Sequence, residues 1–185
     1  MISLIRGTLV EATAQYAIID AAGVGFELGI SSMTAAALPA LGTECRLYAR
    51  LQVREDSMTL FGFASKEERA MFDHLLSVSG VGPRLALAIL SRYSVSQLYS
   101  IVMAEDATSM SAVSGVGKKT AQRLILELKS TFAKDHSFAV AEAPAANQTV
   151  MTFSHESSVL EDARQALLSM GFSPQETELA LDGYD

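Results

Sequence analysis

The sequence uses one short stretch twice. Residues 78–82 and residues 113–117 both have the sequence V-S-G-V-G, 35 positions apart. In each copy a Gly-Val-Gly turn leads into an apolar segment with basic residues near its start. Two glycines allow a positive φ and a close approach of the backbone to a ligand, and a helix start offers unpaired N–H groups at the positive end of its dipole. The repeat therefore predicts two anion-binding helix starts in tandem.

Basic side chains strengthen both predicted sites, because a cation adds a charge-assisted hydrogen bond to a bound phosphate. We expect two phosphates of one nucleic-acid backbone as the ligands, held by backbone N–H groups of the turns and by these cations. The predicted contact residues are Ser79, Gly80, Val81, Gly82, Arg84, Ser114, Gly115, Val116, Gly117, Lys118, Lys119 and Arg123.

Two nucleotide-binding patterns are the sharper alternatives, and neither fits. The pattern G-x-x-x-x-G-K-[ST] requires Gly at 112 and Ser or Thr at 119, where the chain has Ala112 and Lys119. The pattern G-x-G-x-x-G requires Gly at 85 or 120, where the chain has Leu85 and Thr120. The stretch instead resembles the helix-hairpin-helix motif, which grips DNA backbones through such a turn without reading bases.

The formal net charge of −7 argues against a nucleic-acid binder only if it is taken globally. Residues 65–135 hold nine Lys and Arg against seven Asp and Glu, whereas residues 136–185 hold one against eight. Residues 1–64 hold four against six. Both glycine turns thus lie in the one segment with net positive charge, and this local field is what matters for binding.

Composition excludes several other classes. The 49% hydrophobic content supports real cores, and no run of 18 apolar residues predicts a membrane span. Residues 1–10 do not resemble a signal peptide. Cys45 is the only cysteine, so no intramolecular disulfide forms, which fits a reducing cytoplasm. The three histidines are far apart in sequence, so we expect neither a metal site nor a cofactor.

Residues 1–64 are predicted to form strands. The expected strands are residues 4–10, 15–21, 24–30, 46–53 and 58–63, with turns at 21–23 and 38–42. Five short strands in so few residues favour a small closed barrel of the OB type, with a small sandwich as the alternative. Residues 54–57 then form the tip of a hairpin, and a solvated polar turn is its simplest interpretation.

The period becomes helical at Ser65. Ser65 and Glu68 predict a capping box for a helix whose inner face holds Met71 and Leu75. Further helices are predicted to begin near Pro83, Ser94 and Asp106, and a longer helix that reaches Leu128 is predicted after the Gly115 turn. We expect residues 65–135 to be the DNA-binding domain, residues 136–155 a flexible linker, and residues 156–185 a small domain of two short helices.

The order of these parts resembles the RuvA family of bacterial Holliday-junction subunits, over nearly the whole chain. Its most specific motifs are V-R-E-D followed by L-F-G-F (residues 53–56 and 60–63), G-V-G-P-R-L-A-L-A-I-L (80–90) and G-V-G-K-K-T-A-Q-R-L-I (115–125). The resemblance implies a multidomain α+β fold: an OB-like barrel, a tandem helix-hairpin-helix domain, a linker and a UBA-like helical domain.

The resemblance also implies how such a chain works. It implies a homotetramer, or two tetramers face to face, that holds a four-way junction open in recombination and repair. Glu55 and Asp56 would form an acidic pin at the junction centre. The C-terminal domain would recruit the ATP-driven RuvB motor through Leu167, Met170 and Phe172, and the RuvC resolvase is a further partner. The family's C-terminal domain has three helices, whereas residues 156–185 predict two.

An enzyme is the competing interpretation, as a helix-hairpin-helix glycosylase or nuclease. A glycosylase needs a catalytic Asp, often with a Lys, beside a base-flipping pocket, and after the second turn the chain offers only Glu127 and Lys129 on a helix. Glu55 and Asp56 could pair as nuclease metal ligands, but no third acid lies nearby in sequence. We therefore expect a non-catalytic DNA-binding subunit of the bacterial cytoplasm.

Overall fold

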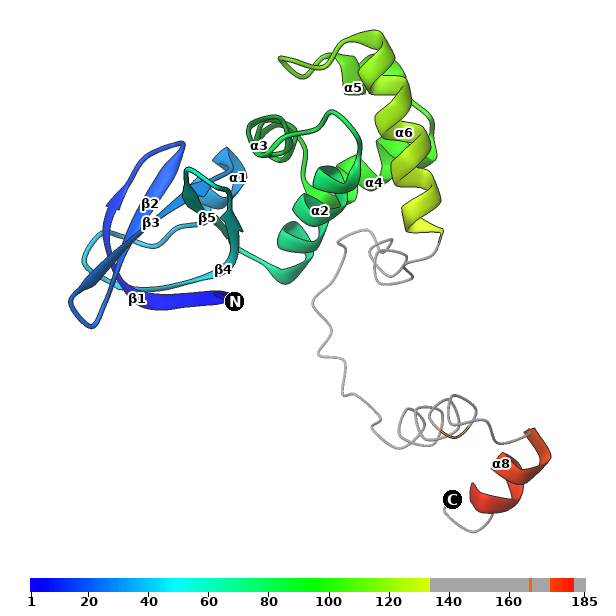
Figure 1. Cartoon of the computed structure of the whole chain (residues 1–185), viewed down its shortest axis with the longest axis horizontal. Coiled ribbons are helices and arrows are strands. Elements are labelled where there is room, and N and C mark those ends of the chain that lie inside the picture. The colour runs from blue at the N-terminus through cyan, green and yellow to red at the C-terminus, as the bar shows by residue number, and fades with distance from the viewer. Residues whose placement is uncertain (134–166, 168–173, 182–185) are drawn as a thin grey trace, which may run out of the picture. The chain divides into compact units, whose positions relative to one another are not determined.

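The computed structural model describes residues 1–133, Leu167 and residues 174–181 (Figure 1). The chain divides into two compact units, Met1–Ala143 and Pro144–Asp185. The predicted linker, most of the predicted first helix of the tail, and Met170 and Phe172 lie outside the described residues. The second helix of the tail is present as α8 (Pro174–Leu181).

The N-terminal part of the first unit is a closed five-stranded barrel. Its strands are β1 (Leu4–Ala12), β2 (Tyr16–Ala21), β3 (Val24–Ile30), β4 (Glu44–Val53) and β5 (Met58–Phe63), in the spatial order β1-β2-β3-β5-β4. All neighbours are antiparallel except β3 and β5, whose parallel pairing matches Leu28 with Leu60. The predicted OB-like barrel is confirmed, and β1 and β4 are each slightly longer than predicted.

A short helix, α1 (Ser32–Ala36), lies between β3 and β4 and was not predicted. Its five residues make little more than one turn, so they carry no apolar stripe that a periodicity argument could detect. Ser31 caps it, because the Ser31 hydroxyl accepts a hydrogen bond from the Thr34 amide at 3.0 Å. Helix α1 contributes Thr34 to the contact between the barrel and α2.

The second part of the unit is helical. Its helices are α2 (Lys66–Ser77), α3 (Pro83–Arg92), α4 (Val95–Met103), α5 (Ala107–Ser111) and α6 (Lys118–Phe132). The first Gly-Val-Gly turn joins α2 to α3, and the second joins α5 to α6, so the predicted tandem arrangement of helical hairpins is confirmed.

The capping box predicted at Ser65 is only half formed. The Ser65 hydroxyl accepts from the Glu68 amide at 3.1 Å, but the Glu68 carboxylate binds Ser31 and Thr34 of the barrel instead of the Ser65 amide. The prediction failed because a buried carboxylate found better donors far away in the sequence. By contrast, Ser94 and Gln97 at the start of α4 form a complete capping box.

Strand β5 is shared by two apolar cores. Leu60 packs with the barrel interior, which includes Leu9, Ile19, Leu28 and Leu47. Phe61 and Phe63 belong instead to the helical core, where their ring centroids lie 5.1 and 4.9 Å from that of Phe72 on α2. Burial on both faces of one strand joins the barrel to the helices.

Among the described helices, none by itself is long and apolar enough to cross a bilayer. Only α3 and α4 together, bent by 96° at the break between them, satisfy length and composition.

Candidate nucleic-acid interface

The first glycine turn is built by one left-handed residue. Gly80 has φ 86°, a conformation that side chains strongly disfavour. The turn closes when the Val81 amide donates to the Val78 carbonyl at 3.1 Å, and the side chains of Val78 and Val81 are buried. Gly82 then serves as the N-cap of α3, with φ −95° and ψ 171°, and no side chain caps this helix.

The second turn repeats each of these features. Gly115 has φ 89°, and the Val116 amide donates to the Val113 carbonyl at 3.0 Å. Gly117 is the N-cap of α6, with φ −80° and ψ 166°, and again no side chain caps the helix. The sequence repeat is therefore a repeat of backbone geometry.

Hydrogen bonds inside the two turns leave fewer backbone amides free to bind a ligand. The amides of Val81 and Val116 were predicted phosphate donors, but each is already used inside its own turn. Within the described residues, no hydrogen bond uses the amides of Gly80, Gly82, Gly115 or Gly117. The first-turn amides of α3 and α6 also lack a capping side chain.

Gly82 and Gly117 have no internal reason to be glycine. Their φ values are negative, so any residue could adopt them. Apart from the glycine itself and its two neighbours in sequence, no heavy atom of the described chain lies within 4 Å of a Cβ placed on either residue. A glycine kept at an open, unstrained position leaves room for a group from outside the chain.

The two turns lie side by side. A Cβ placed on Gly115 would be 3.3 Å from Cδ1 of Leu85, which is in the first turn of α3. The Ser79 amide donates to Oε2 of Glu127 on α6 at 3.4 Å. Two uncapped helix starts are thus held next to each other by contacts between the hairpins.

Among the described residues, three of the four predicted cations form no ion pair within the chain. Arg84, Lys118 and Lys119 are exposed, and none of the ion pairs in the described part of the chain involves them. Arg123 differs, because its Nε donates to Oε1 of Glu127 at 2.7 Å. This bond holds the pKa of Glu127 below its ordinary value. Ser79 and Ser114 are exposed beside the turns.

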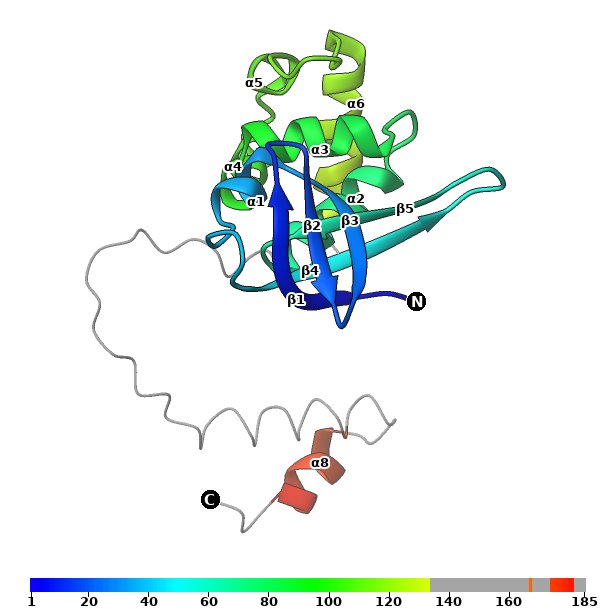
Figure 2. The same ribbon diagram turned by 90° about the vertical axis from the view of Figure 1, so that its left-hand side faces the viewer.

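The acidic residues Glu55 and Asp56 lie at the tip of the β4–β5 hairpin, as predicted. The tip closes when the Arg54 amide donates to the Ser57 carbonyl at 2.8 Å, and both acidic side chains are exposed. The hairpin projects beyond the barrel on the right of Figure 2, the side on which the α2–α3 turn also lies.

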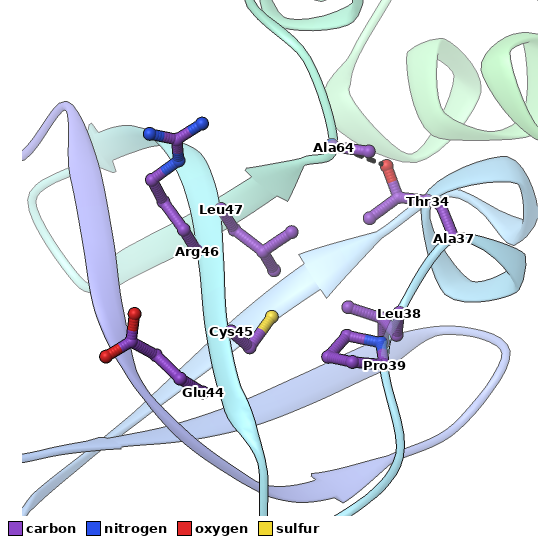
Figure 3. A pocket seen from close by; sticks show the side chains of 9 residues that line it. All are labelled: Thr34, Ala37, Leu38, Pro39, Glu44, Cys45, Arg46, Leu47 and Ala64. Carbon is purple, nitrogen blue, oxygen red and sulfur yellow. Dashed lines mark hydrogen bonds between the residues drawn. The ribbon is translucent and has the colours of Figure 1, made fainter.

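Three cavities among the described residues are lined by residues outside the two glycine turns. One of about 190 Å³ opens between α1 and the start of β4, beside Cys45 and Leu38 (Figure 3). Burial raises the pKa of the Cys45 thiol, which disfavours the reactive thiolate. Among the described residues, no group of three or more His, Cys, Asp or Glu side chains could hold a metal ion.

Comparison with known proteins assigns the two parts of the first unit separately. The family model described as RuvA N terminal domain matches residues 1–62, and the model described as SAM-like Helix-hairpin-helix tandem matches residues 72–130. A protein of Marinomonas sp. (strain MWYL1) is 40% identical over 183 residues, covering 99% of this chain and 89% of the relative. This chain belongs to the RuvA family.

Other RuvA relatives are similar over the same extent. The protein of Pseudomonas entomophila (strain L48) is 42% identical over 181 residues, covering 98% of this chain and 88% of the relative. That of Pseudomonas fluorescens (strain SBW25) is 40% identical over 181 residues, with 98% and 89% covered. All three relatives are named Holliday junction branch migration complex subunit RuvA.

The predicted partner-binding residues lie in the second unit. Leu167 is helical and half-buried, whereas Met170 and Phe172 lie outside the described residues. In α8, Thr177 is buried and Leu179 is 80% exposed. The assignment of Leu167, Met170 and Phe172 to a partner-binding surface stays a prediction.

Proposed function

We propose that this RuvA-family chain binds four-way DNA junctions by their backbones and serves as the DNA-holding subunit of a branch-migration complex. The observation that carries the proposal is the pair of adjacent, uncapped helix starts at Gly82 and Gly117. Each presents free amides and an exposed cation to a phosphate. The names of the relatives support the junction as the ligand.

Such contacts suit a junction-binding protein because they are blind to sequence. Amides, Arg84, Lys118 and Lys119 bind phosphate oxygens, which position a protein on DNA without distinguishing bases. A junction that migrates presents new bases at every step, so recognition has to rest on the backbone. Arg123 can join these contacts through the guanidinium N–H groups that its bond to Glu127 leaves unused.

Structural selectivity would come from the hairpin. Glu55 and Asp56 carry negative charge at an exposed tip, where phosphates converge at a junction centre but not in plain duplex. Like charges at 4 Å repel by about 1 kcal/mol in water, and more where solvent is excluded. The tip therefore disfavours continuous duplex across the centre and favours separated strands.

The remaining assignments complete the proposal. Residues 1–64 form the barrel domain, and residues 65–135 bind DNA. Residues 136–155 are the linker to residues 156–185, which bind the motor subunit RuvB. The chain acts as a homotetramer or as two tetramers, with RuvC as a further partner, in the bacterial cytoplasm. It is proposed to bind without catalysing, because the interface consists of amides and cations and contains no acid–base pair. A glycosylase or nuclease would show itself as strand cleavage when junction DNA and Mg²⁺ are present.

The proposal is tested by removing the free cations. Replacing Lys118 and Lys119 with Ala should weaken binding to junctions of any sequence alike. The slope of log affinity against log salt should become shallower by about 0.9 for each phosphate that the protein no longer neutralises. The matched control is Arg6→Ala with Lys66→Ala, which removes the same charge away from the turns. Equal slopes for the two double variants would contradict the proposal.

The hairpin is tested separately. Glu55→Gln with Asp56→Asn keeps size and polarity but removes the charge. Duplex should then bind more tightly while junction binding stays similar or rises, so the junction-to-duplex affinity ratio falls. Paired titrations at one salt concentration measure this ratio. An unchanged ratio would show that the tip is only a solvated polar turn.

A further inference from the structure

A buried carboxylate lies at the joint between the barrel and the helices. Glu68 on α2 is 7% exposed, and Ser31, the N-cap of α1, and Thr34 within α1 are fully buried. One carboxylate oxygen accepts from the Ser31 hydroxyl at 2.5 Å. The other accepts from the Thr34 hydroxyl at 2.6 Å and from the Ala64 amide at 3.2 Å.

Every side-chain oxygen of these groups has a hydrogen-bond partner, and both hydroxyl protons are donated to Glu68. The Ser31 oxygen also accepts from the Thr34 amide at 3.0 Å, and the Thr34 oxygen accepts from the Ala64 amide at 3.1 Å. We call Ser31, Thr34, Ala64 and Glu68 the joint network. A buried charge is costly unless it is fully bonded, and a fully bonded polar network has one allowed geometry, which apolar packing does not require.

Apolar packing around this network is incomplete. The cavity of about 190 Å³ in Figure 3 is lined by Thr34 and Ala64, and the figure shows the bond between them at its edge. A second cavity of about 200 Å³ is lined by Ala64, Ser65 and Glu68. Since Ala64 lines both cavities, directional hydrogen bonds have the larger part in setting the orientation here.

The network connects the elements that carry the two kinds of DNA contact. Ala64 directly follows β5, which forms the acidic hairpin with β4, and Glu68 is on α2, which leads into the first glycine turn. The Ser32 amide also donates to Ser91 Oγ on α3 at 2.9 Å, and Arg50 of β4 pairs with Asp73 of α2 at 3.0 Å.

We propose that Glu68 is a positioning residue for structure-selective DNA binding: the joint network sets the orientation of the acidic hairpin relative to the two glycine turns. The inference rests on the proposed function. The six residues of β5 separate the joint from the hairpin tip, or about 20 Å at 3.3 Å per residue. A rotation of about 10° at the joint would move the tip by roughly 3 Å over that length. Phosphate contacts at the turns tolerate such a rotation, whereas alignment with a junction centre does not.

The test uses the complete chain and two variants of the network. Thr34→Val keeps the shape of the side chain and removes one donor to Glu68, and Glu68→Gln keeps its size and removes the charge. We expect both to lower the ratio of junction to duplex affinity by about threefold or more, as for groups coupled in one network. Duplex should bind more tightly, as it should when the charge of the tip is removed, whereas the salt slope should not change, because the turns are intact.

The matched control is Ile19→Val, which shortens a fully buried side chain of the barrel core away from the joint. It lowers stability without touching the network, so its affinity ratio should equal that of the parent. If Thr34→Val also keeps the parent ratio, the network is merely structural and the inference is wrong. If the parent itself binds junction and duplex equally, the proposed function fails, and the inference fails with it.

A distance measurement covers the case in which Thr34→Val or Glu68→Gln folds too poorly for DNA titrations. Spin labels at Ser57→Cys and Gln122→Cys, in a Cys45→Ala background, report the separation of the hairpin tip from α6. Ser31→Ala removes the hydroxyl that donates to Glu68 and accepts from the Thr34 amide, and it leaves the bond from Thr34 to Glu68 in place. The inference expects a shifted or broader distance distribution in Ser31→Ala and Thr34→Val, and unchanged distributions in both would overturn it.

Discussion

The helices of the DNA-binding part begin in two different ways. At α2, α4 and α5 a polar side chain closes the first turn: the hydroxyls of Ser65 and Ser94 accept from the amides of Glu68 and Gln97, and the Asp106 carboxylate accepts from two amides. At α3 and α6 the N-cap is Gly82 or Gly117, and no side chain closes the turn.

The difference separates helix starts that serve stability from helix starts that serve binding. An N-cap glycine costs only a few tenths of a kcal/mol relative to Ser or Asp, so leaving two helices uncapped weakens the fold little. In return, the amides at the positive ends of both helix dipoles stay open to an anion. Substitutions at these positions can convert one kind of helix start into the other or weaken one of them.

The largest effect is expected from capping the second open start. In Gly117→Asp the carboxylate would accept from the first-turn amides of α6 and occupy the place of a phosphate. Junction affinity should fall by about tenfold to a hundredfold, since a hydrogen bond to a charged group contributes about 1.5–3 kcal/mol. The helix should become no less stable. Titration with junction DNA and thermal unfolding measure the two effects.

The control for this variant is Ser94→Asp. It adds the same charge at an N-cap that is already closed, so DNA affinity should change little. If Ser94→Asp and Gly117→Asp weaken binding equally, general charge repulsion explains the loss, and the open start of α6 is not a phosphate site.

The next effect concerns the left-handed glycines that shape both turns. Alanine at φ 86° or 89° is strained by about 1–2 kcal/mol. Gly115→Ala should lower the free energy of unfolding more than Gly80→Ala, because its Cβ would meet Leu85 at 3.3 Å, whereas at Gly80 the space is open. Denaturant unfolding of both variants measures the difference, and equal losses would show that Leu85 yields without cost.

A smaller effect is expected from removing the side chain that caps the start of α4. Ser94→Ala removes the hydroxyl that accepts from the Gln97 amide and should lower the free energy of unfolding by about 1 kcal/mol. Junction affinity should not change, since α4 contributes no predicted contact. Ser94→Gly should cost only a few tenths of a kcal/mol. Reduced DNA binding by folded Ser94→Ala would contradict the division between the two kinds of helix start.

The smallest effect is a pH dependence at the closed start of α5. Hydrogen bonds from Ser109, and also from the Thr108 amide, lower the pKa of Asp106 below its ordinary value of 3.8. A lowered folded-state pKa contributes stability that is complete above the unfolded-state value and is lost as pH falls through the folded-state value. Stability should therefore decline below about pH 4, and less steeply in Asp106→Asn. Acid unfolding of the parent and of Asp106→Asn measures this difference. If the stability of both falls equally steeply with decreasing pH, the prediction is wrong.

Much of this molecule was predictable because its signals are local. Strand β3 coincides with the alternation of apolar residues over residues 24–30. Helices α3 and α4 begin where Pro83 and Ser94 indicated, and α6 begins with a basic residue directly after the second glycine turn, as expected. The left-handed Gly80 and Gly115 follow from the Gly-Val-Gly pattern itself. Each of these features depends on interactions within a few residues, and such interactions are visible in the sequence.

The candidate site was predictable in outline but not in its hydrogen bonds. The sequence placed Arg123 and the amides of Val81 and Val116 among the phosphate contacts. Only the folded chain shows Arg123 bonded to Glu127 and those amides closing their own turns. A donor's partner is decided by competition between nearby acceptors in space, which a motif does not describe.

By itself, the sequence determined the order of strands and helices, the two glycine turns and the charge beside them. The tertiary structure decided the parallel pairing of β3 with β5, the presence of α1 and the partners of Glu68. These partners lie 37 and 34 residues away at Ser31 and Thr34. The sequence could not reveal them, because a buried carboxylate takes whichever donors the packed chain brings to it, and local spacing favoured the nearby capping box instead.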